Sequence, residues 1–573
     1  MEFLAFLYVA GLVFLFAVAY SVLGLTICSL FRWRWMVRQG LGLNAVLGLA
    51  AALLFLEVWN FFYPINHASV WVLFFFVLGS TILIWRTLVA AVRDSIRGSG
   101  VLVGFFLLLL LLTVSWFGLG PSESGHYDTG LYYLTSIRWA QAFPVVPGLA
   151  NLHTRLGFNQ SLFLLVAFIA KLMNLGLARA CQVVNPIVVF ISGWAILDRL
   201  KLNLTLAKAK RIRLYGILLI GPLFFLASHM WISAPTADIG AAVYALPGAL
   251  VAICCLEEIF DRNVLEARNW LFLLTIIGST LMKLKLSYAV LGGTAIGIAA
   301  IGLFFIQARE FYRSWIRAGI LAAVVVAPWA VRGVALTGYP FYPSTFLRFR
   351  TDWALPRKRA DSERDWIYSW ARWPTKDPDD VLHSDAWFGP WVERNAKDPE
   401  NIFLFLVITG GLFSTFLSLA IPMSRQRRLQ TLLVALPAAL GLIFWFKTAP
   451  DPRFGYATLL LFGINGFYAS GSALFRISSL RAVIFIGVVT VGSLLMVFRN
   501  EWPLISLYQK KFPQGFPKAA LTYQTTNSGL RVGIANEQAW DSGLVVTPYW
   551  EPRLSLRGSE LRDGFKIKQS VRR

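Results

Sequence analysis

Long runs of hydrophobic residues, each ended by a short polar or basic segment, dominate the sequence. Residues 4–30, 101–119 and 483–498 are three of these runs. An α-helix rises about 1.5 Å per residue, so such runs are long enough, or nearly so, to cross the roughly 30 Å hydrocarbon layer of a membrane. The pattern therefore predicts an all-α polytopic membrane protein.

Basic clusters between the hydrophobic runs predict which connections lie inside. Lys and Arg concentrate in cytoplasmic loops, so we expect the clusters that begin at Arg32, Arg86, Arg199, Arg309, Arg425 and Arg476 to be cytoplasmic. Residues 161–177 are apolar enough to insert, but a crossing there would invert every later basic loop. We therefore predict a juxtamembrane or re-entrant segment there and about fourteen spans: residues 3–29, 42–61, 69–88, 101–119, 180–198, 212–230, 237–256, 270–285, 287–306, 318–335, 401–420, 430–447, 456–474 and 482–498.

This topology divides the chain into five segments and places both termini outside. The last segment is predicted to be small and α/β or β-rich, because residues 529–535 and 543–549 have the patterns of strands. Juxtamembrane helices are expected in the outside loops. The segments are N-terminal transmembrane helices (1–100), a transmembrane core with an outside loop at 120–160 (101–336), an outside loop (337–400), C-terminal transmembrane helices (401–498) and an outside C-terminal segment (499–573).

Composition agrees with a membrane protein and argues against nucleic-acid binding, disulfides and a thiolate metal site. Only 14% of the residues are charged, whereas soluble proteins carry about a quarter. The net charge of +23 follows the short basic loops, so no nucleic acid is expected as a partner. The four cysteines lie in or beside apolar runs, which argues against disulfides and against a thiolate metal site.

The outside loop at 120–160 contains the candidate catalytic residues, Asp128 and Glu123. Asp128, Tyr132, Thr135 and Trp139 have helical spacing and are predicted to share one helix face. A carboxylate just outside the bilayer could accept the proton of a sugar hydroxyl as it attacks an anomeric carbon. A helix-terminal acid, favoured by the helix dipole, is the structural alternative for Asp128.

A lipid phosphate leaving group would need basic partners. Lys283 and Lys285 interrupt two apolar spans, and Arg453 lies in a proline-bounded turn; snorkelling lysines and a simple surface turn are the alternatives. Arg332 is a further basic candidate for the phosphate. No spacing of His and carboxylates indicates a metal site, and no cofactor is firmly implied, with a divalent metal left open. The predicted substrate-binding residues are Tyr132, Arg138, His153, Arg155, Asp238, Lys283, Lys285 and Arg453.

Several motifs resemble those of the GT-C superfamily of membrane glycosyltransferases, such as protein O-mannosyltransferases and lipid A aminoarabinose transferases. Tyr-Asp-Thr-Gly-Leu-Tyr at 127–132 resembles the superfamily's acidic-residue-then-Tyr pattern, and Pro-Asp-Pro-Arg-Phe at 450–454 resembles its late Pro-Arg-Tyr motif. Gly-Tyr-Pro-Phe-Tyr-Pro at 338–343 is similar to a loop start in such proteins. Blocks at 127–132, 145–153 and 155–159 are most similar to a poorly characterised bacterial membrane group.

The resemblance implies a GT-C-like fold and an inverting glycosyltransferase. Its partners would be a polyprenyl-phosphate sugar donor, a glycan, lipid or protein acceptor, and membrane lipids. The active site would face the periplasm from a bacterial cytoplasmic (inner) membrane. The usual paired Asp-Glu is absent, and three spans precede the one expected to be first. A polymerase of lipid-linked glycan repeat units, and a lipid-linked glycan transporter or flippase without chemistry, stay as alternatives.

Overall fold

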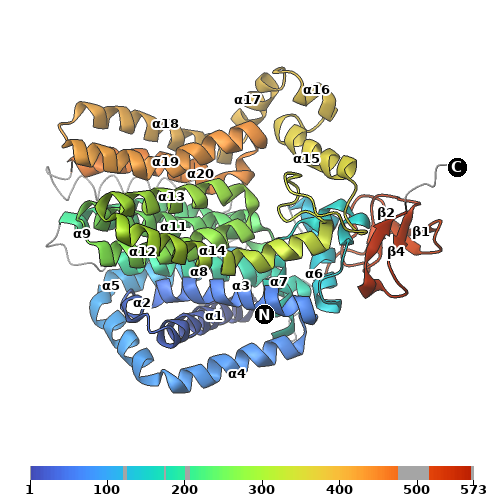
Figure 1. Cartoon of the computed structure of the whole chain (residues 1–573), viewed down its shortest axis with the longest axis horizontal. Coiled ribbons are helices and arrows are strands. Elements are labelled where there is room, and N and C mark those ends of the chain that lie inside the picture. Colours follow the sequence, from blue (N-terminus) through green and yellow to red (C-terminus); the bar gives the residue numbers. More distant parts are fainter. Residues whose placement is uncertain (1, 121–125, 173–175, 201–206, 475–514, 569–573) are drawn as a thin grey trace.

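A computed structural model of the chain describes residues 2–120, 126–172, 176–200, 207–474 and 515–568 (Figure 1). These residues are mostly helical, and a small β-containing segment lies at the C-terminal end. Within the described ranges, nine helices are long and apolar enough to cross a membrane, or ten if one bent pair counts as a single span. The predicted polytopic helical protein with a small β-containing tail is therefore confirmed at this level.

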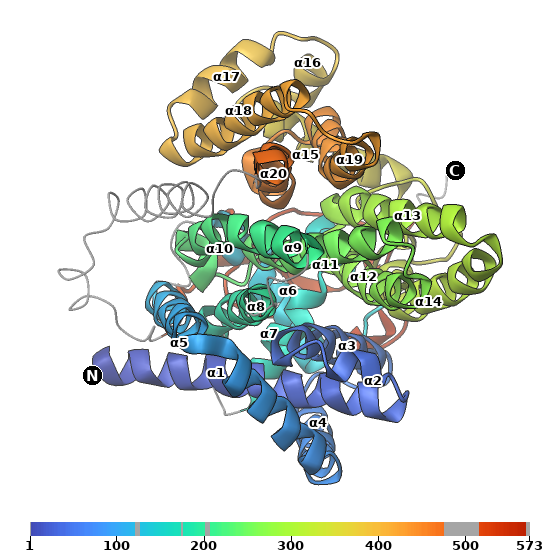
Figure 2. The same ribbon diagram turned by 90° about the vertical axis from the view of Figure 1, so that its left-hand side faces the viewer.

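The nine long helices coincide with nine of the predicted spans, and they form the main body of the protein. In the end-on view, α1, α3–α5 and α8 form one group, α11–α14 a second and α18–α20 a third (Figure 2). The helices are α1 (Glu2–Leu30), α2 (Arg34–Val37), α3 (Leu41–Phe62), α4 (His67–Leu83), α5 (Trp85–Gly118), α6 (Leu134–Ala142), α7 (Ser161–Leu172), α8 (Leu177–Arg199), α9 (Ala207–Leu218), α10 (Ile220–Ala227), α11 (Ala237–Phe260), α12 (Val264–Leu284), α13 (Ala289–Ile306), α14 (Ala308–Thr337), α15 (Arg357–Arg372), α16 (Pro378–Leu382), α17 (Phe388–Ala396), α18 (Pro399–Ala420), α19 (Arg425–Thr448) and α20 (Tyr456–Leu474).

Fourteen separate long spans are not found in the described part of the chain. The predicted span at 69–88 is a bent pair, because α4 and the start of α5 meet at 78°. The span predicted at 212–230 is divided into α9 and α10, where Pro222 fits the first turn of a new helix but lacks an N–H for a continuous one. The last predicted span, 482–498, lies outside the described residues.

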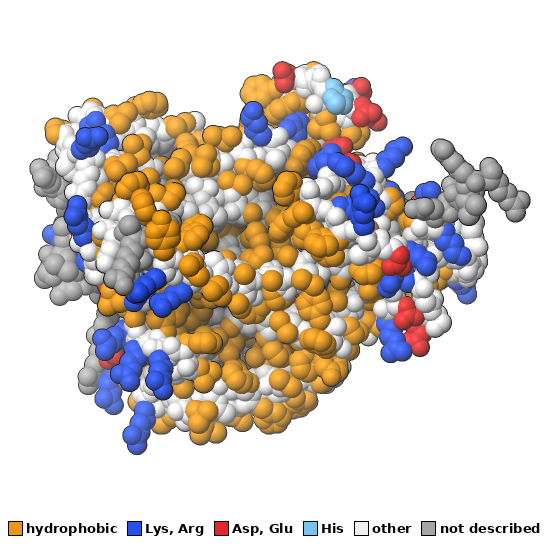
Figure 3. Space-filling model, in the orientation of Figure 1, with side chains coloured by type: hydrophobic (Ala, Val, Ile, Leu, Met, Phe, Trp, Pro, Cys, Tyr) orange, Lys and Arg blue, Asp and Glu red, His pale blue; other side chains and the backbone are white. Residues whose placement is uncertain are grey.

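Contacts between helix ends bring several basic connections to one end of the bundle. Arg199, at the end of α8, donates to the side chain of Gln39 between α2 and α3 at 3.0 Å. Arg211 of α9 pairs with Glu257 near the end of α11, and Gln426 of α19 donates to the carbonyl of Phe260. Figure 3 shows a hydrophobic middle zone with Lys and Arg gathered towards both ends of the molecule.

Within the segment at 161–177, residues 161–172 form the short helix α7, which does not span the bundle. Its twelve residues extend about 18 Å, well short of the hydrocarbon thickness. The Ser161 hydroxyl donates to Glu57 at 2.5 Å, and the Ala167 carbonyl accepts from Gln141 at 3.2 Å, so α7 lies at the end of the bundle where α3 and α6 end. By its length, α7 is not among the helices that could cross a membrane.

The C-terminal segment, residues 515–568, packs on the loop between α5 and α7. Its strands form a three-stranded sheet, β1-β2-β3, and a separate pair, β4-β5. The predicted strands at 529–535 and 543–549 appear as the shorter β2 and β3. The strands are β1 (Leu521–Thr525), β2 (Arg531–Ala535), β3 (Val546–Thr547), β4 (Leu554–Leu556) and β5 (Phe565–Ile567), with β2–β3 parallel and the other two pairings antiparallel.

Main-chain contacts hold this segment against the loop. The backbone N–H of Trp540 donates to the carbonyl of Gly130 at 2.8 Å, and that of Phe565 donates to Pro147 at 2.9 Å. A Cβ atom added to Gly130 would lie 2.7 Å from the Trp540 ring, closer than packed atoms tolerate. Gly130 is thus required for the approach of the two chain segments.

We expect Gly130→Ala to destabilise the protein by roughly 1–3 kcal/mol, because the added methyl overpacks against Trp540. Denaturation in detergent micelles would measure the change. The matched control is Gly389→Ala, since a Cβ at Gly389 meets nothing within 4 Å. The cost of Gly130→Ala should shrink in a Trp540→Ala background; an equal cost in both backgrounds would contradict the contact.

Candidate functional site

Asp128 lies at the start of a helical segment that leads into α6. Residues Thr129–Tyr133 form a π-helical turn before α6 begins, and the extra residue in such a turn rotates the side chains that follow. Tyr132 and Tyr133 therefore both face the cavity beside Asp128. The predicted shared face is only partly correct, because Thr135 and Trp139 are buried and do not line that cavity.

The cavity has a volume of about 250 Å³ and lies among segments that are far apart in the sequence. One wall comes from α15, and another from the C-terminal end of α19 and the turn that follows it. The floor includes the start of α11 and the connection between α12 and α13. Its lining residues are Asp128, Tyr132, Tyr133, Arg155, Phe158, Gln160, Asp238, Lys285, Leu286, Ser287, Pro343, Ser344, Arg364, Trp366, Ile367, Tyr368, Trp370, Phe444, Trp445, Thr448, Ala449, Arg453 and Phe454.

Asp128 is buried and contacts two arginines. Arg155 Nη1 lies 3.1 Å from Asp128 Oδ1, and Arg453 Nη1 lies 3.6 Å from Asp128 Oδ2. Arg155 Nε also donates to Glu363 Oε1 at 3.0 Å, and Thr154 Oγ1 donates to Glu363 Oε2 at 2.6 Å. Arg155 is therefore shared between two carboxylates, which raise the pKa of its guanidinium above the usual value despite the opposing effect of burial.

A second acid, Asp238, lies in the first turn of α11 and binds a lysine. Lys285 Nζ contacts Asp238 Oδ1 at 2.5 Å, and His126 Nε2 lies 3.5 Å from Asp238 Oδ2. The Thr236 hydroxyl caps α11 by accepting the backbone N–H of Asp238. Lys285 also donates to the carbonyl of Arg453 at 3.0 Å, so this ion pair is attached directly to the turn after α19.

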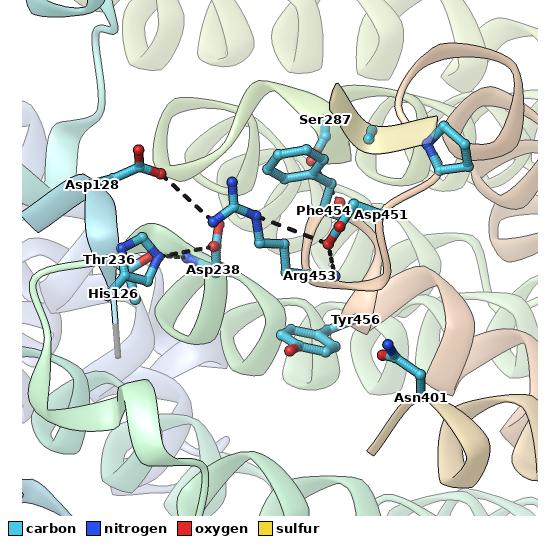
Figure 4. A network of polar contacts seen from close by, with 12 residues as sticks. His126, Asp128, Thr236, Asp238, Ser287, Asn401, Asp451, Arg453, Phe454 and Tyr456 are labelled. Atoms are coloured by element: carbon cyan, nitrogen blue, oxygen red, sulfur yellow. Dashed lines mark hydrogen bonds and ion pairs between the residues drawn. The ribbon is translucent and has the colours of Figure 1, made fainter. Parts of the chain in front are cut away.

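Arg453 lies between acids from three parts of the chain (Figure 4). Asp451, bounded by two prolines, accepts the backbone N–H of Arg453 at 3.2 Å, and its carboxylate lies 3.6 Å from Arg394. Burial raises the pKa of Asp451 above its usual value, although both arginines oppose this. Burial lowers the pKa of Arg453, but Asp128, Asp451 and Asp238 outweigh it and raise the value, so Arg453 stays charged.

Aromatic rings cover the basic groups from the side of α15. The guanidinium carbon of Arg155 lies 4.6 Å from the Trp366 ring centre, and that of Arg453 lies 4.6 Å from the Trp370 ring centre. The lining set contains four basic side chains but only two carboxylates. A cavity of this composition can hold an anion such as a phosphate, with flat aromatic faces left for an attached sugar.

Lys283, a predicted binding residue, does not lie in the site, and the prediction is wrong for this residue. Its ammonium group lies 2.9 Å from Glu57 of α3, with both side chains almost completely buried, and it does not line the cavity. The chain leaves helical geometry at Lys285, where φ is −152° and ψ is 116°. The two lysines therefore point to different places, Lys283 between helices and Lys285 into the cavity.

Three other predicted residues lie away from the cavity. Arg138 forms a two-point ion pair with Asp541 of the C-terminal segment, at 2.6 and 2.5 Å. His153 makes an edge-to-face contact with the Tyr549 ring, and burial together with Arg155 and Arg359 lowers its pKa to about 3. Arg332 of α14 donates to the side chains of Asn60 and Asn159. Glu123 lies outside the described residues.

Tyr132, Arg155, Asp238, Lys285 and Arg453 are the predicted binding residues that the structure brings together with Asp128. Glu363 was missed, because no local motif marks this residue of α15 and only the fold brings it to the site. Across the ranges that the structure describes, no group of three or more His, Cys, Asp or Glu side chains could hold a metal ion.

Comparisons with known proteins give one match. A family model described as "Domain of unknown function (DUF8201)" matches residues 6–460, which is more than half of the chain. No curated protein and no solved structure matches the chain. The matched range contains Asp128, Arg155, Asp238, Lys285 and Arg453, whereas the C-terminal segment lies beyond it.

We expect Glu57→Gln to destabilise the protein by roughly 3–5 kcal/mol, because it leaves the buried Lys283 without its carboxylate. Thermal unfolding in detergent would measure the loss. Replacing both residues by Met should restore most of the stability, since no buried charge is then left unpaired. If Lys283→Met instead weakened phosphate binding with stability unchanged, the pair would belong to the site.

Proposed function

We propose a function from the geometry of the site. The chain belongs to the family described as "Domain of unknown function (DUF8201)", and that description states no activity. The proposed activity is the inverting transfer of a sugar from a polyprenyl-phosphate donor to an envelope glycan, lipid or protein. The enzyme would be of the GT-C type. The observation that carries this proposal is the single cavity in which the buried Asp128 faces Arg453 and Lys285.

In the proposed reaction, Asp128 acts as the general base. The acceptor hydroxyl attacks the anomeric carbon from the face opposite the phosphate and loses its proton to Asp128 as the new bond forms. The bond between the anomeric carbon and the phosphate oxygen breaks, and the electron pair leaves with the lipid phosphate. Arg453 and Lys285 would stabilise the negative charge that develops on that group.

The distances of the existing ion pairs indicate which contact a donor phosphate would displace. Arg453 is farther from Asp128, at 3.6 Å, than Arg155 is, at 3.1 Å. A donor phosphate would compete for Arg453 and leave Asp128 held by Arg155 alone. Arg155 is fixed in turn by Glu363, so the base would keep its position while the cavity fills. Trp366, Trp370 and Tyr132 supply aromatic faces on which a sugar can lie.

The proposed location is the periplasmic side of a bacterial inner membrane. The connections with Arg199, Arg211 and Arg427 lie at one end of the bundle, and the Arg427 side chain reaches Glu257 there. The cavity lies where α3, α5, α12 and α19 reach their other ends. If basic connections are cytoplasmic, the cavity faces outwards, where a lipid-linked sugar and an envelope acceptor can meet.

Replacing Asp128 with Asn should reduce sugar transfer by about 10²–10⁴-fold, because the amide keeps the size of the side chain but cannot accept the proton. Transfer by purified protein from a polyprenyl-phosphate sugar, measured beside donor binding, is the test. Asp385→Asn is the matched control, since Asp385 is exposed between α16 and α17.

Parental transfer by Asp128→Asn would make Asp128 a structural acid and would direct the search to Asp238. Transfer of whole glycan repeat units onto one another would identify a polymerase. Movement of the lipid-linked glycan across a vesicle membrane without any bond change would replace the enzyme proposal by the transporter alternative.

Lys285→Gln and Arg453→Gln should each weaken donor binding by about 10–100-fold, because each removes a charged partner of the phosphate. Binding of a polyprenyl phosphate without sugar, measured by calorimetry in detergent, separates this effect from catalysis. Lys376→Gln is the control, since Lys376 is exposed and lies beside Trp373 outside the cavity. Unchanged binding in both site variants would contradict the phosphate assignment.

A further inference from the structure

The connection between α14 and α15 folds back along the membrane-spanning helix that it leaves. Gly338 ends α14 in the left-handed region, with φ of 85°, and reverses the chain. A Cβ atom on Gly333 would lie 2.7 Å from the Pro340 carbonyl oxygen, so the returning chain runs directly over α14. The Phe341 ring then lies 6.1 Å from the Trp329 ring, about two turns or roughly 12 Å before the helix ends.

The tip of this connection, residues 344–350, combines exposed apolar and basic side chains. We call these residues the rim loop. Phe346 is 85% exposed, Phe349 is 50% exposed and Leu347 is 45% exposed. Arg348 and Arg350 alternate with them and are also exposed. Such a mixture is costly in water but suits the boundary between lipid tails and headgroups.

The rim loop is held in place at both ends. The backbone N–H of Phe349 donates to the Gly338 carbonyl at 2.9 Å, and the Thr345 hydroxyl donates to Asp361 of α15 at 2.9 Å. Arg364 also contacts Thr345 at 3.1 Å. The apolar side chains are therefore presented outwards by a fixed loop.

The helix that the connection leaves, α14, has a lipid-facing surface of its own. Ile320, Val324 and Val331 of α14 are all more than half exposed, as expected for side chains that meet hydrocarbon in a spanning helix. A loop that folds back along α14 reaches the depth at which the polar end of this helix meets the lipid headgroups. The rim loop directly follows Pro343 and begins with Ser344, and both of these residues line the cavity.

We propose that the rim loop is a membrane-interface site that binds anionic phospholipids. Phe346, Leu347 and Phe349 enter the upper part of the lipid tails on the side of the membrane where the cavity lies. Arg348 and Arg350 bind the phosphates of neighbouring headgroups, each charge adding to the attraction of an anionic surface. The cavity edge at Pro343 and Ser344 is thereby fixed against the lipid layer. This assignment depends on the membrane placement alone and on no sugar chemistry.

Site-directed spin labelling of the full chain in lipid nanodiscs tests this placement. A label on Leu347→Cys should be more accessible to oxygen, which concentrates in lipid, than to a water-soluble nickel complex. The four native cysteines are buried and should not compete for the label. Ser362→Cys on the exposed side of α15 is the control and should show the reverse order. Access of the nickel complex to both positions alike would overturn the proposal, and so would protection of Leu347 from both reagents, which would indicate a protein partner.

The headgroup preference has its own test. Arg348→Gln combined with Arg350→Gln should move the Leu347 label towards water in nanodiscs of phosphatidylglycerol. The same pair of changes should leave the label unmoved in nanodiscs of phosphatidylcholine, which also shows that the variant is folded. An equal effect, or none, in both lipids would overturn the anionic-lipid assignment. The measurement involves no sugar transfer, so its failure is distinct from a failure of the proposed enzyme activity.

Discussion

Arg155 lies between two carboxylates, Asp128 on the segment before α6 and Glu363 on α15. Burying a guanidinium is costly unless it is fully paired, so this contact fixes these two segments relative to each other. Arg453, in the turn after α19, also contacts Asp128, and Lys285, at the end of α12, donates to the carbonyl of Arg453. Four segments that are distant in the sequence are thus joined through one set of shared charges, and the cavity is the space that they enclose.

The hydrophobic pattern predicted the long helices because the bilayer imposes a simple length requirement. Nine predicted spans coincide with long apolar helices, and the C-terminal strands were found in part from their alternation. The pattern was less informative where a helix bends or is interrupted. The 78° bend between α4 and α5 and the division at α10 depend on local backbone geometry, which an average of hydropathy over twenty residues does not record.

The candidate site was predictable where a residue type was unusual for its place. Asp128, Asp238, Lys285 and Arg453 are charges at the ends of apolar helices, and the fold brings them together. Lys283 has the same local signal but finds Glu57, a partner from α3 that no spacing in the sequence reveals. Glu363 lies in a charged helix without a distinguishing motif, so its role depends on tertiary contacts. Arg138 and His153 face the C-terminal segment, a contact between residues some four hundred positions apart in the chain.

The docking of that segment has a consequence for the order in which the protein is made. Trp540 and Asp541 contact the loop that holds Asp128, yet the ribosome adds them after α20. During synthesis and membrane insertion, the loop around Asp128 is therefore formed before the C-terminal segment that packs on it. A nascent chain that has inserted all helices up to α20 still lacks the Arg138–Asp541 ion pair and the Trp540 contact with Gly130. The loop can take its final form only after residues 515–568 have been made and have docked against it.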